Sequence, residues 1–224
     1  MTKKLIIVLL LTISSLHNTV ISQTLNWSTI ENSKHIISAG IGWDYSLTYS
    51  AGYGHKLNSK IPIVLHLNLS APLGDKAFDD FKTKIGGQLC LFNKSNFMGS
   101  VSVLGIYRRY QNDLVQIQNF GSELKGTFGY YKPKWFLASE IGFDKAIVSH
   151  FKHSKTYREN IFSDVKDGWY EPATGGNLYY GIQTGYSFKK SDLTLKICKI
   201  MTQDLKTTPT VPLYLMLGYN KRID

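Results

Sequence analysis

The sequence predicts an all-β protein, a closed antiparallel β-barrel of about ten strands, with eight as the fallback number. Apolar and polar residues alternate through most of the chain after residue 34, which is the period of a strand with one apolar face. Short turns rich in Lys, Asn and Ser alternate with longer connections. Aromatic residues make up 13% of the chain and charged residues only 19%, which favours a β-rich wall over a charged soluble surface.

The overall composition excludes several other classes of protein. A chain of 224 residues has room for one domain, or for two small ones. Its 2 cysteines cannot build a disulfide framework or a Cys-only zinc site. The net charge of +10 comes from basic residues scattered through turns and loops, so we do not expect a nucleic-acid-binding surface.

The first 22 residues have the pattern of a secretory signal peptide. Lys3 and Lys4 precede an apolar run at 5–13, and Val20-Ile21-Ser22 loosely matches a small-x-small cleavage site. The apolar run is shorter than the ~20 residues that a membrane-spanning helix needs. We therefore expect a cleaved signal peptide at 1–22, an N-terminal lead segment at 23–34 and the barrel at 35–223.

The first two predicted strands come from a single alternating stretch. From Ile37 to Tyr53 the odd positions are mostly apolar and remain in phase. One strand of that length would be unusual. A three-residue loop at 43–45 preserves the phase, so the stretch is divided into strands at 35–42 and 46–57.

The other strands follow from the same period of two. Alternation is clearest at 61–71, where Leu65, Leu67 and Leu69 share one face with His66 and Asn68 on the other. It is also clear at 134–149, 176–189 and 211–222, and it is noisier in the remaining segments. The full set of predicted strands is 35–42, 46–57, 61–71, 81–92, 97–110, 115–131, 134–149, 176–189, 192–203 and 211–222.

The connections fall into two classes. Tight turns lie near 58–60, 93–96, 131–134 and 189–192, whereas the longer loops are 72–80, 150–175 and 204–210. The links at 43–45 and near 111–113 are exceptions, because they are short although they belong to the second class. Short turns at one end and longer loops at the other are typical of bacterial outer-membrane barrels. An even number of strands also brings both termini to the short-turn end.

The chain resembles the small outer-membrane β-barrel proteins of Gram-negative bacteria. The resemblance covers residues 35–223 as an architecture, and it includes the signal peptide and a Tyr-rich last strand in which Tyr219 would replace the usual terminal aromatic residue. It implies a transmembrane barrel in the outer membrane, secreted across the inner membrane, with apolar side chains facing lipid. A secreted, soluble lipocalin-like carrier would alternate too, with its apolar face inward.

The polar face predicts a crowded lumen. It is mostly Gly and Ser with a few charges of both signs, which we expect to pair because buried charges normally do. Barrels of eight to ten strands are filled by side chains, so we expect a mostly plugged lumen and no open pore. The predicted lumen polar network is His66, Lys82, Lys84, Gln88, Arg108, Glu123, Lys125, Glu140, Asp144 and Lys196.

The long loop at 150–175 is the candidate binding site, because long loops on rigid scaffolds often carry function. His150 and His153 lack an acidic partner nearby, so no metal site is predicted. The candidate binding residues are His150, His153, Tyr157, Arg158, Trp169 and Tyr170.

These observations predict a structural or interaction role, which includes that of an accessory component of a cell-surface machine. Expected partners are membrane lipid and another envelope protein or a surface glycan; no nucleic acid, cofactor or catalytic residue is predicted. One alternative is a barrel enzyme acting on lipid, of the lipid A deacylase or phospholipase type. Ser149 and His150, with Glu140 and Asp144 on the same strand, are its candidates, although no Ser-containing family motif accompanies them. The other alternative is the soluble lipocalin-like carrier.

Overall fold

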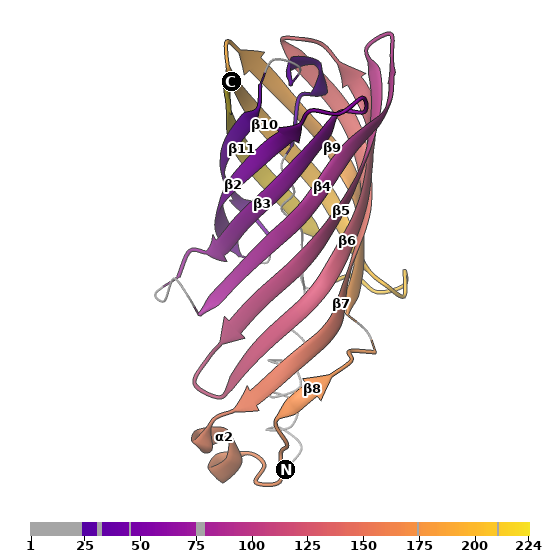
Figure 1. Cartoon of the computed structure of the whole chain (residues 1–224). Coiled ribbons are helices and arrows are strands. Elements are labelled where there is room, and N and C mark those ends of the chain that lie inside the picture. Colours follow the sequence, from indigo (N-terminus) through magenta and orange to yellow (C-terminus); the bar gives the residue numbers. More distant parts are fainter. Residues whose placement is uncertain (1–23, 31–32, 45, 75–78, 174, 210) are drawn as a thin grey trace.

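The computed structural model describes residues 24–224 except 31–32, 45, 75–78, 174 and 210, so the predicted signal peptide lies outside the described residues. The chain folds almost entirely into antiparallel strands (Figure 1). The elements are η1 (Trp27–Thr29), β1 (His35–Trp43), β2 (Leu47–Leu57), β3 (Ile63–Pro72), β4 (Asp80–Lys94), β5 (Phe97–Gln111), β6 (Val115–Tyr131), β7 (Trp135–His153), α2 (Lys155–Asn160), β8 (Gly168–Tyr170), β9 (Gly176–Phe188), β10 (Ser191–Thr202) and β11 (Leu213–Ile223).

Ten of the strands close into a barrel. Each pairs with the next along the chain, β7 pairs with β9, and β1 pairs with β11 from His35↔Ile223 to Trp43↔Leu215. The predicted closed antiparallel barrel of ten strands is therefore confirmed, and the fallback of eight is not needed. Among the described residues, no helix is long and apolar enough to cross a membrane.

The barrel wall is apolar outside and polar inside. On β3, Leu67 is 48% exposed on the outer surface whereas His66, its neighbour in the chain, is 6% exposed in the lumen. The same alternation repeats around the wall, because a period of two sends successive side chains to opposite faces. This polarity is the reverse of that expected for a soluble carrier, whose apolar face would line the interior.

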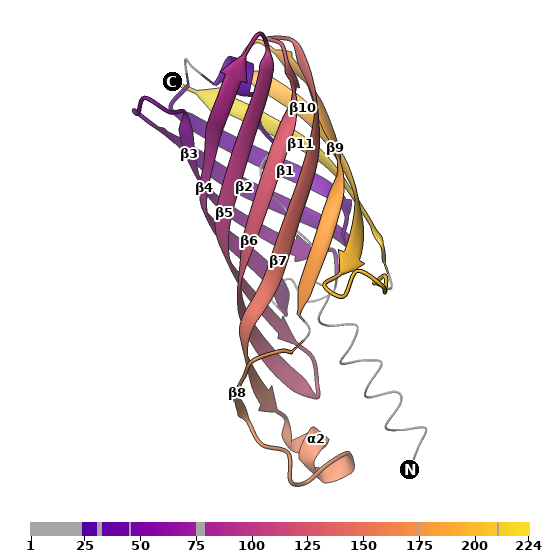
Figure 2. The same ribbon diagram turned by 90° about the vertical axis from the view of Figure 1, so that its right-hand side faces the viewer.

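Strands β5, β6 and β7 extend well beyond the rest of the barrel at the long-loop end (Figure 2). Residues 135–145 of β7 pair with β9, whereas 149–151 pair with β8. We call the projecting parts of β5, β6 and β7, together with β8, the distal sheet. The predicted end of this strand at 149 and the predicted loop at 150–175 were thus wrong in detail. A β-bulge between Phe120 and Gly121 shifts the register, so that Ile147 has no partner and the alternation changes phase.

The N-terminal segment enters the barrel mouth at the short-turn end, close to the C-terminus (Figure 1). Leu25, Trp27 and Ile30 are each at most 5% exposed and belong to one apolar cluster with strand side chains such as Phe136. The predicted lead segment at 23–34 is thus part of the core over residues 24–30. The sequence did not predict the burial of this segment, because so short a segment shows no periodicity.

Candidate functional site

All ten residues of the predicted lumen network are buried, each at most 6% exposed. Glu123 on β6 lies at the centre of one cluster. Its Oε2 is 2.6 Å from Lys84 Nζ on β4, and its Oε1 accepts a hydrogen bond from the Tyr179 hydroxyl at 2.6 Å. Tyr179 fits across the lumen because its register partner is Gly142, where a Cβ would lie 2.2 Å from the tyrosine ring. The structure thus shows that Lys84 and Glu123 are in contact. Tyr179 on β9, which fits beside Gly142 on β7, completes this cluster.

Glu140 on β7 organises a second cluster. Its Oε1 lies 2.5 Å from Lys196 Nζ and accepts a hydrogen bond from Cys198 Sγ at 3.0 Å. Lys196 Nζ also lies 5.5 Å from the ring centroid of Tyr179 and 5.3 Å from that of Tyr214, which are favourable cation–π distances. The Cys198 thiol is therefore held in a salt-bridge cluster, and it is not paired with Cys90.

Toward the long-loop end, two further ion pairs fill the lumen. Arg108 makes a bidentate contact with Asp80 at 2.9 and 2.7 Å, and Lys82 Nζ lies 3.4 Å from Asp44. Sequence reasoning missed both acids because it assigned them to connecting loops. Their even numbers, in phase with the lumen residues of the adjoining strands, are the signal that could have found them.

The mid-lumen charges balance in number. Five basic side chains face five acidic ones among the described residues, so the network needs no outside counter-ion to be neutral overall. The basic residues are Lys82, Lys84, Arg108, Lys125 and Lys196; the acidic ones are Asp44, Asp80, Glu123, Glu140 and Asp144. The remaining predicted members, His66 and Gln88, are also buried, and Gln88 donates to Ser100 Oγ at 3.0 Å.

Hydrogen bonds fix the N-terminal segment in the mouth. Asn26, 1% exposed, donates from Nδ2 to the Lys132 carbonyl at 3.0 Å and to Ser187 Oγ at 2.8 Å. From β11, Asn220 donates to the Thr24 carbonyl at 2.7 Å, and Arg222 donates to the Thr29 carbonyl at 3.0 Å. These partners lie on the β6–β7 turn, β9 and β11, and the apolar cluster of Trp27 and Ile30 includes side chains of β3, β4 and β5, so the segment lies across the short-turn mouth of the lumen.

The six candidate binding residues of the predicted loop lie on three elements and two faces. His150 and His153 lie on β7, Tyr157 and Arg158 on α2, and Trp169 and Tyr170 on β8. His150 packs against Trp169 with ring centroids 4.8 Å apart, on the face continuous with the outer wall. His153, Tyr157 and Tyr170 lie on the opposite face, where His153 is 4.8 Å from Tyr157 between centroids. The six residues do not form one continuous surface, because neighbouring strand residues point in opposite directions; whether they bind a partner stays a prediction.

An ion-pair cluster ties α2 to the distal sheet. Asp167 accepts hydrogen bonds from the backbone N–H and the ring of His153, each at 2.9 Å, and lies 2.7 Å from Arg158. These contacts lower the pKa of Asp167 to about 2, the His153 backbone hydrogen bond contributing most. Beside the cluster is an open groove of about 440 Å³, lined by Phe151, Phe162 and Tyr170 among others.

The arrangement does not bring the hydrolase candidates together. Ser149 is 1% exposed and accepts a hydrogen bond from Asn119 Nδ2 at 2.8 Å, on the face opposite His150. Glu140 and Asp144 are buried in the lumen, also away from His150. In the part of the chain that the structure describes, no three His, Cys, Asp or Glu side chains are grouped to hold a metal ion.

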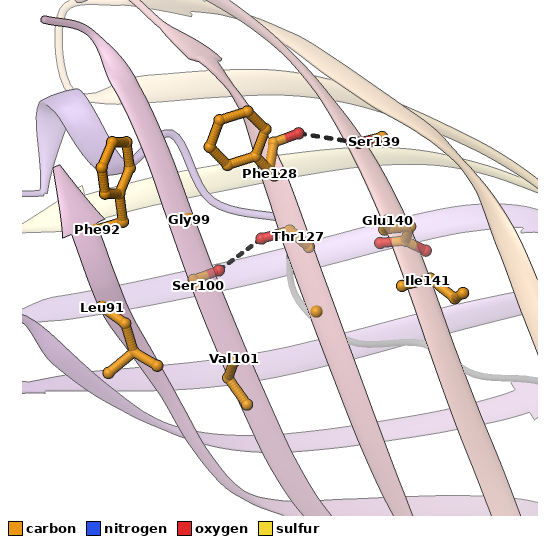
Figure 3. Close-up of a pocket in the computed structure, with 11 residues that line it drawn as sticks. Leu91, Phe92, Gly99, Ser100, Val101, Thr127, Phe128, Ser139, Glu140 and Ile141 are labelled. Carbon is orange, nitrogen blue, oxygen red and sulfur yellow. Dashed lines mark hydrogen bonds between the residues drawn. The ribbon is translucent and has the colours of Figure 1, made fainter. Parts of the chain in front are cut away.

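A shallow apolar groove of about 440 Å³ crosses the outer wall over β4 to β7 (Figure 3). It exists because Gly99, Gly126 and Ser139 are small, while Phe128 and Ile141 stand beside them, each more than half exposed. Ser139 donates its hydroxyl to the Phe128 carbonyl at 3.1 Å (Figure 3). The groove is therefore a shallow apolar surface, and its shape does not point to a catalytic role.

Comparisons with known proteins give no family assignment. No protein-family model matches the chain, and no curated protein matches it. Among solved structures, one described as "KdgM porin in complex with disordered oligogalacturonate" is similar, with 8% sequence identity and a TM-score of 0.42. The match covers 84% of this chain and 99% of that chain. Values this low support no transfer of a ligand or activity to this chain.

Proposed function

We propose that this protein spans the outer membrane of a Gram-negative cell as a non-conducting barrel and holds its distal sheet and α2 outside the membrane as an interaction surface. The observation that carries the proposal is the polarity of the wall. In the described strands every Asp and Glu is buried in the lumen, whereas the outer surface is formed largely by Leu, Ile, Val and aromatic side chains. A surface of that kind is stable against hydrocarbon and unfavourable in water.

The dimensions of the outer surface support the same placement. On β7 the outward residues run from Trp135 to Phe143 before Lys145, and a tilted strand needs about 9–11 residues to cross a bilayer. At the short-turn end, Phe97, Tyr130 and Trp135 form a row with centroids 5.1 and 5.8 Å apart. Such rows are typical of the membrane interface.

The filled lumen supports a structural or interaction role rather than transport. Ion pairs occupy its middle and the N-terminal segment its short-turn mouth, so no continuous water path is expected. By contrast, β6 and β7 are longer than a membrane crossing requires, with 17 and 19 residues. The excess length carries β8 and α2 away from the barrel, where a partner protein or glycan of the cell surface would meet them. This geometry favours an accessory component of a surface machine.

Fractionation and conductance together test this proposal. We expect the full-length protein, expressed in a Gram-negative host, to remain with the outer-membrane fraction and to migrate differently on gels with and without boiling. In planar bilayers the purified, folded protein should give no stable channel steps. Recovery in the aqueous fraction would refute the membrane placement, and regular channel steps would refute the plugged lumen.

A further inference from the structure

We infer that the outer face of the distal sheet binds the phosphorylated sugar headgroup of an outer-leaflet glycolipid; this rests on the proposed membrane placement. Three rungs of outward side chains define the surface, which we call the distal patch. The central rung runs across four strands, Arg109↔Gln118↔His150↔Trp169. The flanking rungs are Tyr107↔Phe120↔Val148 and Gln111↔Gln116↔Lys152.

The distal patch is continuous with the lipid-facing wall. Along β7 toward its distal end, Lys145 interrupts the apolar run after Phe143, Ile147 is again exposed and apolar, and His150 lies on the same outer surface after the bulge at Ile147. The headgroup of a lipid in the outer leaflet can therefore reach this patch without leaving the membrane.

The distance of the patch from the apolar surface of β7 determines how large a lipid headgroup must be to cover it. His150 and Lys152 lie three and five residues beyond Ile147, the last exposed large apolar residue of β7, and ~3.3 Å per residue at a tilt of ~40° places them about 8 and 13 Å beyond it. Ordinary phospholipid headgroups add only about 5–8 Å to each side of the hydrocarbon core. The central rung therefore lies at the outer limit of phospholipid headgroups, and only a lipid that carries several sugar units covers the whole patch as far as Lys152.

The charges of the patch call for an anionic partner. Inward cations such as Lys84 and Lys196 have carboxylate partners, whereas neither Arg109 nor Lys152 has one in the described part of the chain. Arg109 is half-buried, and its Nη2 donates to the neutral Gln111 Oε1 at 2.7 Å, which leaves the guanidinium charge without a carboxylate. A guanidinium in this state is suited to bind phosphate.

The other side chains suit sugars. Trp169 is 58% exposed and Phe120 41% exposed, with ring centroids 5.9 Å apart. Tyr107 continues the aromatic row at 5.1 Å from Phe120. Flat, exposed rings next to glutamine amides offer apolar faces and hydrogen-bonding groups together, which is what a sugar ring with its hydroxyls requires. The combination of aromatic rings, amides and unpaired cations matches a phosphorylated oligosaccharide better than a peptide or a bare phosphate.

The test uses the full-length, folded protein in phosphatidylcholine nanodiscs and three probes: lipopolysaccharide with its core oligosaccharide, lipid A alone, and the free core oligosaccharide. The double variant Arg109→Gln/Lys152→Gln removes two charges from the patch. Lys166→Gln/Lys206→Gln removes two exposed charges elsewhere and is the matched control. We expect the patch variant to bind lipopolysaccharide about tenfold or more weakly, because it loses two charge-assisted contacts to phosphate. The control should bind like the wild type.

The outcomes separate this inference from the proposed function. Failure of the wild type to insert into nanodiscs would refute the membrane placement itself. Insertion with equal lipopolysaccharide affinity in both variants would overturn the patch alone. Equal affinity of the wild type for lipid A and for full lipopolysaccharide would contradict the height argument. Equally tight binding of the free oligosaccharide would show a soluble glycan, rather than a membrane lipid, to be the ligand.

Discussion

A charged substitution at a single residue of the outer wall can test whether that residue faces lipid or water. Leu67 is the clearest case. It is 48% exposed near the middle of β3, and its register partners are Tyr53 and Ile85. In water such a residue would tolerate a charge. Against hydrocarbon it would not, because a charged side chain at the bilayer midplane costs about 2–4 kcal/mol.

We therefore expect Leu67→Arg to reduce the fraction of protein that folds into lipid vesicles, as measured by the heat-modifiable gel band. Leu67→Phe is the matched control and should fold like the wild type, because it retains an apolar surface. Equal folding of the two variants would contradict the outward, lipid-facing assignment of this residue.

Within the lumen, the Glu140 carboxylate is the partner of a buried cation, Lys196. It is 3% exposed and receives both Lys196 and Cys198. We expect Glu140→Gln to lower the free energy of unfolding by about 3–5 kcal/mol, because it leaves a buried cation without its partner. Urea unfolding in vesicles measures this. The double variant Glu140→Gln/Lys196→Met should recover part of the loss, and a single variant as stable as the wild type would refute the role of the pair.

At the scale of elements, the strands could largely be predicted and the exceptions have physical causes. Alternation located ten strands, because one face of each is apolar and the period of two is strict. It failed beyond Ile147, where the bulge reverses the phase, so the extension of β7 and the position of β8 were missed. It also could not find the N-terminal segment, whose burial depends on Asn26 and Trp27 meeting parts of the wall far away in the sequence.

The N-terminal segment should stabilise the whole barrel through Asn26. Asn26→Ala removes the hydrogen bonds to Lys132 and Ser187 and leaves a buried carbonyl and hydroxyl without that partner. We expect a loss of about 1–3 kcal/mol in the free energy of unfolding. Ser28→Ala is the control, because the Ser28 side chain bonds, among the described residues, only to Asn26. If both variants unfold at the same urea concentration, the segment is not bound in the mouth as described.

The attachment of α2 to the distal sheet should depend on pH through Asp167. Its pKa is lowered to about 2 by His153 and Arg158. A depressed carboxyl pKa stabilises the folded state above its ordinary value of ~3.9, and this stabilisation is lost as the pH falls through about 2. We expect pepsin to cut residues 154–167 much faster at pH 2 than at pH 4. In Asp167→Asn the rates at the two pH values should be similar, allowing for the enzyme's own pH dependence; an unchanged pH response there would contradict the role of Asp167.

For the molecule as a whole, the sequence predicted which lumen residues are charged but not how they are paired. Parity alone placed Lys84, Glu123 and Glu140 on one face, whereas their partners depend on the shear of the barrel, which no single strand encodes. The position of residues 24–30 in the barrel mouth could likewise not be predicted from the sequence. Together these contacts give a barrel that is filled inside and apolar outside, with its recognition surfaces at one end.

The most direct test of this account measures the environment of successive residues along β3. Spin labels are attached one at a time to residues 64–69 of a protein in vesicles, with Cys90 and Cys198 replaced by Ser, and their collisions with oxygen and with a water-soluble nickel complex are compared. The account predicts high oxygen accessibility at Leu65, Leu67 and Leu69 and low accessibility to both reagents at Val64, His66 and Asn68. Nickel accessibility at the three leucine positions would contradict it, because their side chains would then face water instead of acyl chains.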